Sequence, residues 1–197
     1  MDGLSLRLVP DALWEIVEPL IPRFAPRSQG GGSTPVDDRV AFTAVVFVLT
    51  SGCAWRHLPP SFGVTVPTAH RRFAAWARAG VFEKLHRAVL DCLGGAGELD
   101  WSAAILDAAS VRAKKGGSLT GPSPVDRGKR GSKIHVLSDA NGIPLVVDVS
   151  GANAHDSTLL LPIVAAIPAV KSRHGPRRGK PGKLRADKGY DYDKHRR

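Results

Sequence analysis

The segment KIHVLSDANGIPLVVDV, residues 133–149, decides the fold of the second half of this chain. Two short runs rich in β-branched side chains, residues 133–138 and 143–149, flank the dipeptide Asn141-Gly142. Asn-Gly is the strongest short hairpin signal, because a type I′ turn needs two residues at positive φ. We therefore predict an antiparallel hairpin, and strand alternation places four side chains of its second strand on one face: Ile143, Leu145, Val147 and Val149.

Further elements of the second half follow from local patterns. In chain order we predict a strand at 101–108, a loop at 114–132, the hairpin, a helix at 156–170, a basic loop at 171–183 and a short strand at 184–186. Pro162 lies too deep for the first turn of the helix and should kink or delay it. The residues of this helix expected in the core are Leu159, Leu160, Ile163, Val164 and Ile167. The order strand, strand, strand, helix, strand predicts an α/β unit.

The first half has helical periodicity. Helices are predicted at residues 10–22, 37–51, 65–79 and 82–93, with a linker or exposed loop at 24–36. The expected helix boundaries are marked by Asp37 and Asp38, Gly52, Thr65, Gly80 and Gly94-Gly95. This order is typical of a helix–turn–helix DNA-binding module with Arg71 and Arg72 exposed on the third helix. The alternative is a plain helical bundle in which both arginines only face solvent.

Charge is distributed unevenly along the chain. The net charge is +10, yet residues 1–100 hold 10 basic and 10 acidic side chains, whereas residues 101–197 hold 18 and 8. A strongly basic half favours a polyanionic partner such as nucleic acid. Basic loops that only keep the chain soluble are the alternative.

Cysteine usage and hydropathy exclude other classes of protein. Cys53 and Cys92 match no metal-ligand spacing and are expected to be reduced thiols of a cytosolic protein. The first ten residues, MDGLSLRLVP, lack the pattern of a secretory signal. The longest apolar run, residues 44–49, is too short to span a bilayer.

Two aspartates occupy strand positions that suit metal chemistry. Asp107 lies in the first predicted strand of the second half, and Asp187 directly follows the last one, 80 residues later. If the first strand is central and the helix returns the chain beside it, the two carboxylates meet. Such carboxylates repel unless a cation lies between them, and Mg²⁺ prefers hard oxygen ligands. Two such ions can activate an attacking oxygen and stabilise a leaving one at a phosphodiester, although two aspartates at strand ends are a weak signal alone.

Motifs spread over nearly the whole chain strengthen this hypothesis. The second half contains ILDAASVRAKKGG, GPSPVDRGKRGSKIHVLSDANGIPL, ANAHDS and LRADKGYD, and the first half contains DALWEIVEPLIP, GCAWRHLPPSFG and RRFAAWARAGVFEKL. In this order they resemble the transposases of the insertion-sequence-five family, members of the DDE superfamily. The resemblance runs from about residue 10 to the end. The combination is specific, whereas any single motif is not.

The resemblance implies an RNase H-like core in which Asp107 and Asp187 are the first two catalytic acids and bind Mg²⁺ or Mn²⁺. The third acid of the family is a Glu on a later helix. Only KGYDYDKHRR follows Asp187, without a Glu, so we expect a truncated core that is inactive alone. Asp191 and Asp193 follow the same strand end and are poor replacements, because metal ligands should converge from separate elements.

Several other residues carry weaker predictions. His135, on a strand, is expected to be a packed histidine. His155 and Asp156 resemble a His-Asp pair of the family, and a helix cap by Asp156 is favoured over a role near the active site. Tyr190 and Lys188 either contact the phosphate backbone or lie in a solvated turn. The DNA-binding residues predicted from charge and position are Arg71, Arg72, Arg127, Lys129, Arg130, Lys133 and Lys188.

Together these patterns predict an α+β protein with a helical DNA-binding domain at 1–97 and an incomplete RNase H-like domain at 98–197. The expected function is that of a bacterial insertion-sequence transposase, which binds transposon ends and catalyses metal-dependent strand cleavage and transfer. A non-catalytic DNA-binding remnant is the main alternative, and a standalone RNase H-like nuclease is a weaker one. The expected partner is double-stranded DNA of transposon ends and target, in the cytoplasm with the nucleoid and without a membrane. A homo-oligomer on DNA, and a second polypeptide that supplies the missing part, both stay open.

Overall fold

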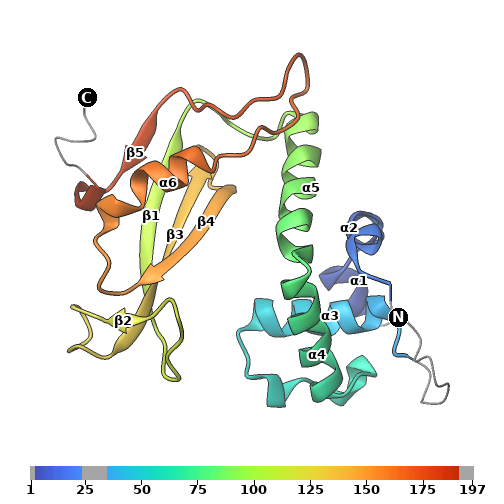
Figure 1. Ribbon diagram of the computed structural model, residues 1–197. Helices are drawn as coiled ribbons and strands as arrows, with labels where there is room; N and C mark the ends of the chain where they lie inside the picture. Colours follow the sequence, from blue (N-terminus) through green and yellow to red (C-terminus); the bar gives the residue numbers. More distant parts are fainter. Residues whose placement is uncertain (1–2, 24–34, 191–197) are drawn as a thin grey trace. The chain divides into compact units, whose positions relative to one another are not determined.

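The computed structural model describes residues 3–23 and 35–190 and combines helices with a sheet (Figure 1). The α+β class predicted from the sequence is confirmed. The chain divides into two compact units, Met1–Val89 and Leu90–Arg197, and the division lies inside helix α5, Val81–Ala96. No helix within the described ranges is long and apolar enough to cross a membrane.

The first unit is helical. Its elements are α1 (Gly3–Leu8), α2 (Asp11–Val17), η1 (Glu18–Leu20), α3 (Asp38–Ser51), η2 (Trp55–His57), η3 (Pro60–Phe62), α4 (Val66–Arg78) and the first turns of α5. The helices predicted from residues 10, 37 and 65 are thereby confirmed, whereas α1 has no counterpart among the predictions. Pro19 lacks an amide hydrogen, so the last turn of the first predicted helix is the 3-10 turn η1. Most of the loop predicted at 24–36 lies outside the described residues.

The ends of α3 and α4 show where capping rules hold. The Asp37 carboxylate accepts the Val40 amide at 3.0 Å, and Gly52 ends α3 with a φ of 66°. Thr65 precedes α4, but its hydroxyl donates to the Thr68 hydroxyl and caps no backbone amide. The prediction of a Thr65 cap is therefore wrong, although the helix begins where it was expected.

Helix α5 is longer than its glycines suggest. It was expected to end at Gly94-Gly95, but it continues to Ala96, and Gly97 follows at a φ of 80°. A Cβ atom at Gly94 would lie 2.1 Å from the carbonyl oxygen of Lys171. The glycine therefore allows a neighbouring chain segment to approach the helix, and it does not end the helix.

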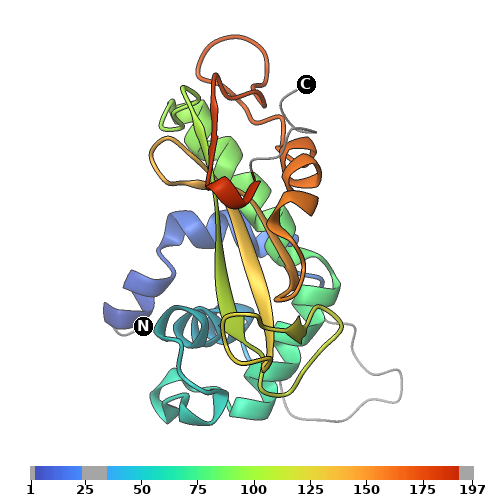
Figure 2. The same ribbon diagram turned by 90° about the vertical axis from the view of Figure 1, so that its left-hand side faces the viewer.

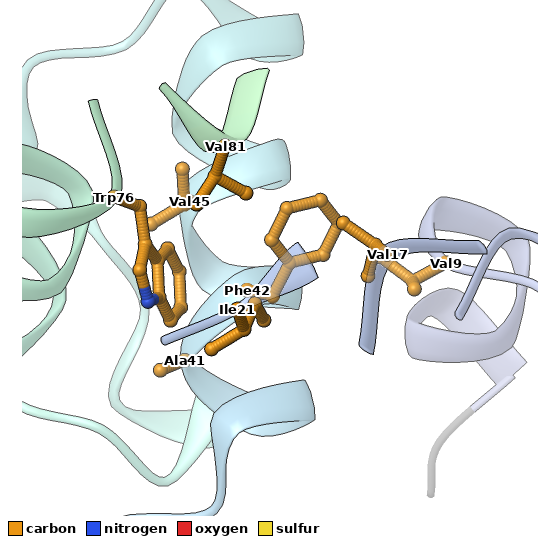
Figure 3. Packing of buried hydrophobic residues seen from close by; sticks show 8 residues of the cluster. All are labelled: Val9, Val17, Ile21, Ala41, Phe42, Val45, Trp76 and Val81. Atoms are coloured by element: carbon orange, nitrogen blue, oxygen red, sulfur yellow. The ribbon is translucent and has the colours of Figure 1, made fainter. Parts of the chain in front are cut away.

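Phe42 of α3 lies at the centre of the main core of the first unit, with Trp76 on one side and Val9 and Val17 on the other (Figure 3). Its ring centroid is 5.9 Å from that of Trp76 and 6.2 Å from that of Trp14. A second cluster of buried residues also includes α3, with Ala44, Val48, Leu58, Val64 and Ala69. Because α3 contributes to both clusters, it is the central helix of this unit.

The second unit is built on a five-stranded sheet. Its strands are β1 (Ala104–Arg112), β2 (Gly121–Pro122), β3 (Arg130–Asp139), β4 (Pro144–Gly151) and β5 (Leu184–Ala186). Strand β3 pairs antiparallel with β1, β2 and β4, and β5 pairs parallel with β1. The lateral order is β4, β3, β1, β5, and β2 pairs with β3 beyond the end of β4. Strand β1 is therefore internal, as the carboxylate hypothesis requires.

The helical segment between β4 and β5 covers one face of this sheet (Figure 1). It begins with the 3-10 turn η4, Asp156–Thr158, and continues as α6, Leu160–Ala165, so Pro162 falls in the first turn of α6. The delay predicted from Pro162 is confirmed. Leu160 and Ile163 are buried against Ala104, Leu106 and Leu137, and the other predicted core residues of this segment pack around them: Leu159, Val164 and Ile167.

The hairpin between β3 and β4 forms with a different turn from the one expected. Gly142 has a φ of 88°, but Asn141 does not have a positive φ, so the turn is not type I′. The Asp139 amide donates to the Ile143 carbonyl at 2.9 Å, which leaves a three-residue loop. The buried Asp139 carboxylate stabilises this loop by accepting the amides of Asn141 and Ile143 at 3.0 and 2.8 Å.

A register shift opposite Leu137 and Ser138 changes the face that β4 buries. Leu145 is 1% exposed, but Val147 is 53% exposed. The prediction that both lie on one face is therefore wrong, because an irregularity in the ladder moves the following side chains to the other face.

Candidate functional site

Asp107 and Asp187 come to neighbouring positions on the sheet. Strands β1 and β5 run parallel, and Leu106 is opposite Ala186 at the last paired position. Asp107 follows Leu106 on β1, and Asp187 follows Ala186 directly after the end of β5, so the two residues leave the same end of this ladder. Both residues are exposed. The structure thus places both aspartates one residue beyond the last β1–β5 pair, and the meeting of their carboxylates stays a prediction.

Each carboxylate is oriented by the backbone amide that follows it. The Asp107 Oδ1 accepts the Ala108 amide at 2.8 Å. The Asp187 carboxylate accepts the Lys188 amide, and the Asp187 carbonyl accepts the Tyr190 amide at 2.9 Å. The hydrogen bond from the Tyr190 amide to the Asp187 carbonyl closes the turn η5, Lys188–Tyr190. The position of Asp187 therefore depends on where Tyr190 is anchored.

Tyr190 is anchored in the core of the second unit by hydrogen bonds. It is 3% exposed and packs with the core cluster between the sheet and α6. Its hydroxyl lies 2.9 Å from Nδ1 of His135, and Nε2 of His135 lies 2.9 Å from the hydroxyl of Ser150. His135 is fully buried, so the prediction of a packed histidine is confirmed. Tyr190 matches neither expectation from the sequence, because it is a core residue.

Burial and nearby charges shift the pKa values of Tyr190 and His135. Burial, followed by the charges of Asp156, Asp107 and Asp187, raises the pKa of Tyr190 to about 12. Burial also lowers the pKa of His135 and outweighs the raising influence of the Asp156 charge. Both groups are therefore neutral at physiological pH, and the phenol lies within electrostatic range of both candidate catalytic carboxylates.

Lys133 and Asp156 form an ion pair next to this chain of hydrogen bonds. The Lys133 ammonium lies 2.8 Å from Asp156 Oδ1 and donates to the Ala154 carbonyl at 2.9 Å. Its side chain is 16% exposed, so the lysine holds β3 to the segment before α6. This engagement argues against the phosphate contact predicted for Lys133. The turn η4 is capped by His155, whose ring accepts the Ser157 amide, so the prediction of a cap by Asp156 is wrong.

The donor chemistry of the carboxylate pair fits part of a magnesium site. Asp107 and Asp187 offer hard oxygen ligands from two separate strands, which is the ligand type that Mg²⁺ prefers. The residues described here contain no group of three or more His, Cys, Asp or Glu that could hold a metal ion. Asp156 is committed to Lys133, and Asp191 and Asp193 lie outside the described residues.

The two arginines predicted to read DNA differ in the first unit. Arg71 is exposed on α4 and makes only weak contacts, at 3.3 Å, with the Pro67 carbonyl and the Thr68 hydroxyl. The Arg72 side chain is 15% exposed, and its guanidinium lies 3.1 Å from Asp38 of α3. The expectation that both are exposed is therefore wrong for Arg72, whose ion pair holds α4 to α3.

The other predicted DNA-binding residues lie on exposed backbone. Arg127, Lys129 and Arg130 are exposed around a turn in which Arg127 itself has a positive φ of 50°. Arg112 braces this turn, with two nitrogens 2.8 and 3.0 Å from the Asp126 carboxylate. Lys188 is also exposed, directly after Asp187. These four cations are available to a ligand, unlike Lys133.

The sequence did not identify the pairing of His135 with Tyr190. A signal was present, since His135 alternates with Leu137 on a strand and is therefore expected on the buried face. A buried imidazole needs polar partners, and Tyr190 and Ser150 supply them. Which distant hydroxyls would do so could not be read from the chain, because these partners are 55 and 15 residues away.

Known protein families match both units of the chain. Residues 9–86 match the family described as "Putative transposase of IS4/5 family", and residues 100–197 match the family "Transposase DDE domain". The chain is 39% identical over 119 residues to the insertion element IS402 uncharacterized 16.2 kDa protein of Burkholderia cepacia, covering 59% of this chain and 81% of that protein. It is 47% identical over 78 residues to the putative transposase for insertion sequence element IS402 of the same organism, covering 40% of this chain and 37% of that protein. No solved structure matches.

The two family matches fall on different parts of the chain and in the expected order. The first covers the helices from α2 to the start of α5, and the second covers the sheet and both aspartates. The resemblance inferred from the motifs is therefore confirmed, and the chain belongs to the IS4/5 family of insertion-sequence transposases with a DDE domain.

Proposed function

We propose that the second unit is the RNase H-like catalytic core of a transposase and that Asp107 and Asp187 are two of its metal-binding carboxylates. The observation that carries this proposal is their register, since they directly follow Leu106 and Ala186, the last pair between β1 and β5. Where two exposed carboxylates approach each other they repel, and a divalent cation between them removes that cost. The strand order β4, β3, β1, β5 supports the proposal because it makes β1 internal and places β5 next to it.

The reaction that this site suits is hydrolysis and transfer at a phosphodiester of transposon-end DNA. Bound divalent metal would supply activation of the attacking oxygen and stabilisation of the leaving one. The chain's own contribution is positioning. Asp107 is fixed by a central strand, and Asp187 is fixed by the η5 turn that Tyr190 anchors in the core. Phosphoryl transfer depends mainly on such positioning and on charge stabilisation.

We further propose that the first unit binds the ends of the element and that the exposed basic residues of the second unit contact phosphates. Arg71 is the favoured base-reading residue because its side chain is exposed on α4. Arg127, Lys129, Arg130 and Lys188 are the favoured phosphate contacts, since all four are exposed. Phosphate contacts fix the register of a protein on DNA, whereas base contacts specify the sequence.

A second candidate function is occupation of transposon ends without cleavage. One observation favours it, because the described residues include no group of three or more His, Cys, Asp or Glu that could hold a metal ion. Both functions share the DNA-binding step and differ in the chemistry that follows.

Binding of Mn²⁺ tests the carboxylate proposal. It is measured as the decrease of the electron paramagnetic resonance signal of the free ion. Asp107→Asn and Asp187→Asn should each weaken binding markedly, because each removes one of two ligands. Asp148→Asn is a matched control, since Asp148 also accepts the amide that follows it, at 2.7 Å, but lies on β4. Equal Mn²⁺ binding by the wild-type protein and the two site variants would refute the proposal.

A further inference from the structure

The segment between α6 and β5 contains a dense group of positive charges. Residues 170–183, which we call the basic hairpin, contain six Lys or Arg residues and no Asp or Glu. No acidic residue occurs between Asp156 and Asp187. In both views the segment leaves α6, passes the end of α5 and returns to β5 (Figures 1 and 2). It was expected only as a loop.

The basic hairpin has an ordered backbone. Val170 is fully buried, and Val170 and Arg178 exchange two backbone hydrogen bonds of 2.7 and 2.8 Å. The Ser172 hydroxyl donates within the turn and lies 2.8 Å from the nearest carbonyl oxygen, that of Pro176. These contacts fix the backbone from which the exposed side chains extend, unlike the backbone of an unstructured basic loop.

One arginine of the basic hairpin serves as its anchor on α5. The Arg177 guanidinium lies 2.9 and 3.0 Å from the two oxygens of Asp91 and donates to the Ala169 carbonyl at 2.8 Å. The Lys171 amide donates to the same carboxylate at 2.9 Å. The close approach of the Lys171 carbonyl to Gly94 completes the attachment. The charge of Arg177 is therefore matched by Asp91.

The remaining cations of the basic hairpin are not matched. Five cations remain, and none of them belongs to an ion pair among the described residues; all are exposed: Lys171, Arg173, Arg178, Lys180 and Lys183. Like charges held close together on a fixed backbone repel, and an anionic polymer relieves that repulsion. The segment contains no Asn, Gln, Phe, Trp or Tyr, so its contacts with DNA would come mainly from Lys and Arg side chains, which bind phosphates.

The place of the basic hairpin in the second unit suggests which part of the DNA it contacts. Lys183 and Asp187 are joined by β5, and four extended residues span roughly 13 Å. Phosphates of one DNA strand follow each other by roughly 3.4 Å along the axis, so the distance corresponds to about four phosphates. A duplex whose backbone passes the carboxylate pair can therefore reach the hairpin with the same strand.

We propose that the basic hairpin binds phosphates of duplex DNA next to the carboxylate pair without sequence preference. The proposal rests on the proposed function and adds to it a second contact surface. It assigns the ordered Asp91–Arg177 pair to holding the hairpin, and it assigns Arg173, Arg178, Lys180 and Lys183 to the DNA.

The test compares the salt dependence of DNA binding for two variants of equal charge. The variant R178Q/K180Q removes two cations of the basic hairpin, and the control K114Q/K115Q removes two exposed cations after β1. Affinity is measured for a transposon-end duplex and for an unrelated duplex. For the hairpin variant, the slope of log affinity against log salt should become shallower by about 1.8, since each lost phosphate contact removes about 0.9. The control should change the slope by much less.

The outcomes separate this inference from the proposed function. Equal loss of affinity on both duplexes, confined to the hairpin variant, supports the inference. An unchanged slope, or an equal change in both variants, overturns the inference while the proposed function stands. A loss that is larger on the transposon-end duplex overturns the absence of sequence preference. A wild-type chain that binds neither duplex overturns both the inference and the proposed function.

Discussion

The hydroxyl of Tyr190 lies 2.9 Å from Nδ1 of His135, inside the core of the sheet unit. The two residues are 55 positions apart in sequence, and Tyr190 follows Asp187 by a single short turn. The hydrogen bond therefore connects the centre of β3 to the segment that carries the second candidate carboxylate. A core contact, and not only the three-residue strand β5, determines where Asp187 lies.

Removing the hydroxyl of Tyr190 should destabilise the protein while leaving its ring packed. We expect Tyr190→Phe to lower the free energy of unfolding by about 1–3 kcal/mol, because His135 is left with an unmatched polar atom in the core. Urea unfolding measures the change. Ser150→Ala, at the other end of the same chain of hydrogen bonds, should give a loss of similar sign. Unchanged midpoints in both variants would show that this chain contributes nothing.

The raised pKa of Tyr190 predicts a loss of stability in alkaline solution. Its pKa is raised from 10.0 to about 12, so the folded state holds the phenolic proton more tightly than the unfolded state does. The resulting stability is fully present below pH 10 and is lost as the pH rises toward 12. Unfolding measured across this range should show a steeper loss for the wild-type protein than for Tyr190→Phe. Parallel curves would contradict the assignment.

Arg71 and Arg72 should give opposite results although they are adjacent. Arg71→Ala should weaken the preference for transposon-end DNA by about 1–3 kcal/mol for one lost base contact, with little effect on unfolding. Arg72→Ala should lower the stability of the first unit, because Asp38 loses the partner that lies 3.1 Å away. Gel-shift competition and thermal unfolding measure the two effects. A loss of DNA preference that is confined to Arg72→Ala would refute this division of roles.

Gly94 and Gly95 provide a matched pair on one helix. Gly94→Ala places a Cβ atom 2.1 Å from the Lys171 carbonyl oxygen and should destabilise the protein by about 1–3 kcal/mol, because a backbone segment must move. Gly95 has nothing within 4 Å of the same position, so Gly95→Ala should stabilise α5 by about 0.5–1 kcal/mol. Chemical denaturation of the two variants gives the comparison. The same sign of effect in both would mean that the contact at Gly94 is not tight.

The purified chain should bind Mg²⁺ or Mn²⁺ weakly and should not nick DNA. Two carboxylates leave most of the coordination sphere of a hard cation to water, and misplacement of reacting groups by about 1 Å can cost a hundredfold in rate. Labelled transposon-end DNA incubated with Mn²⁺ reveals nicking. Nicking that requires the metal and disappears in Asp107→Ala would show that two carboxylates suffice.

The sequence alone determined most of the elements and their order, whereas α1 and β2 were not predicted. Periodicity and caps predicted α3 from Asp37 to Gly52, and the alternating runs around Asn141-Gly142 predicted the β3–β4 hairpin. Local patterns succeed at these sites because a cap, a tight turn or a buried helix face depends on residues close together in the chain. The same patterns, joined to family motifs, also singled out Asp107 and Asp187.

The tertiary structure decided everything that depends on residues far apart. The role of Gly94 depends on the Lys171 carbonyl, which packs closely against it. The position of the Arg72 side chain depends on its ion pair with Asp38. The face buried by β4 depends on an irregularity opposite β3, which alternation within β4 cannot reveal. The anchoring of Asp187 depends on the distant pair of Tyr190 and His135, and a buried polar group accepts whichever partner the fold brings to it.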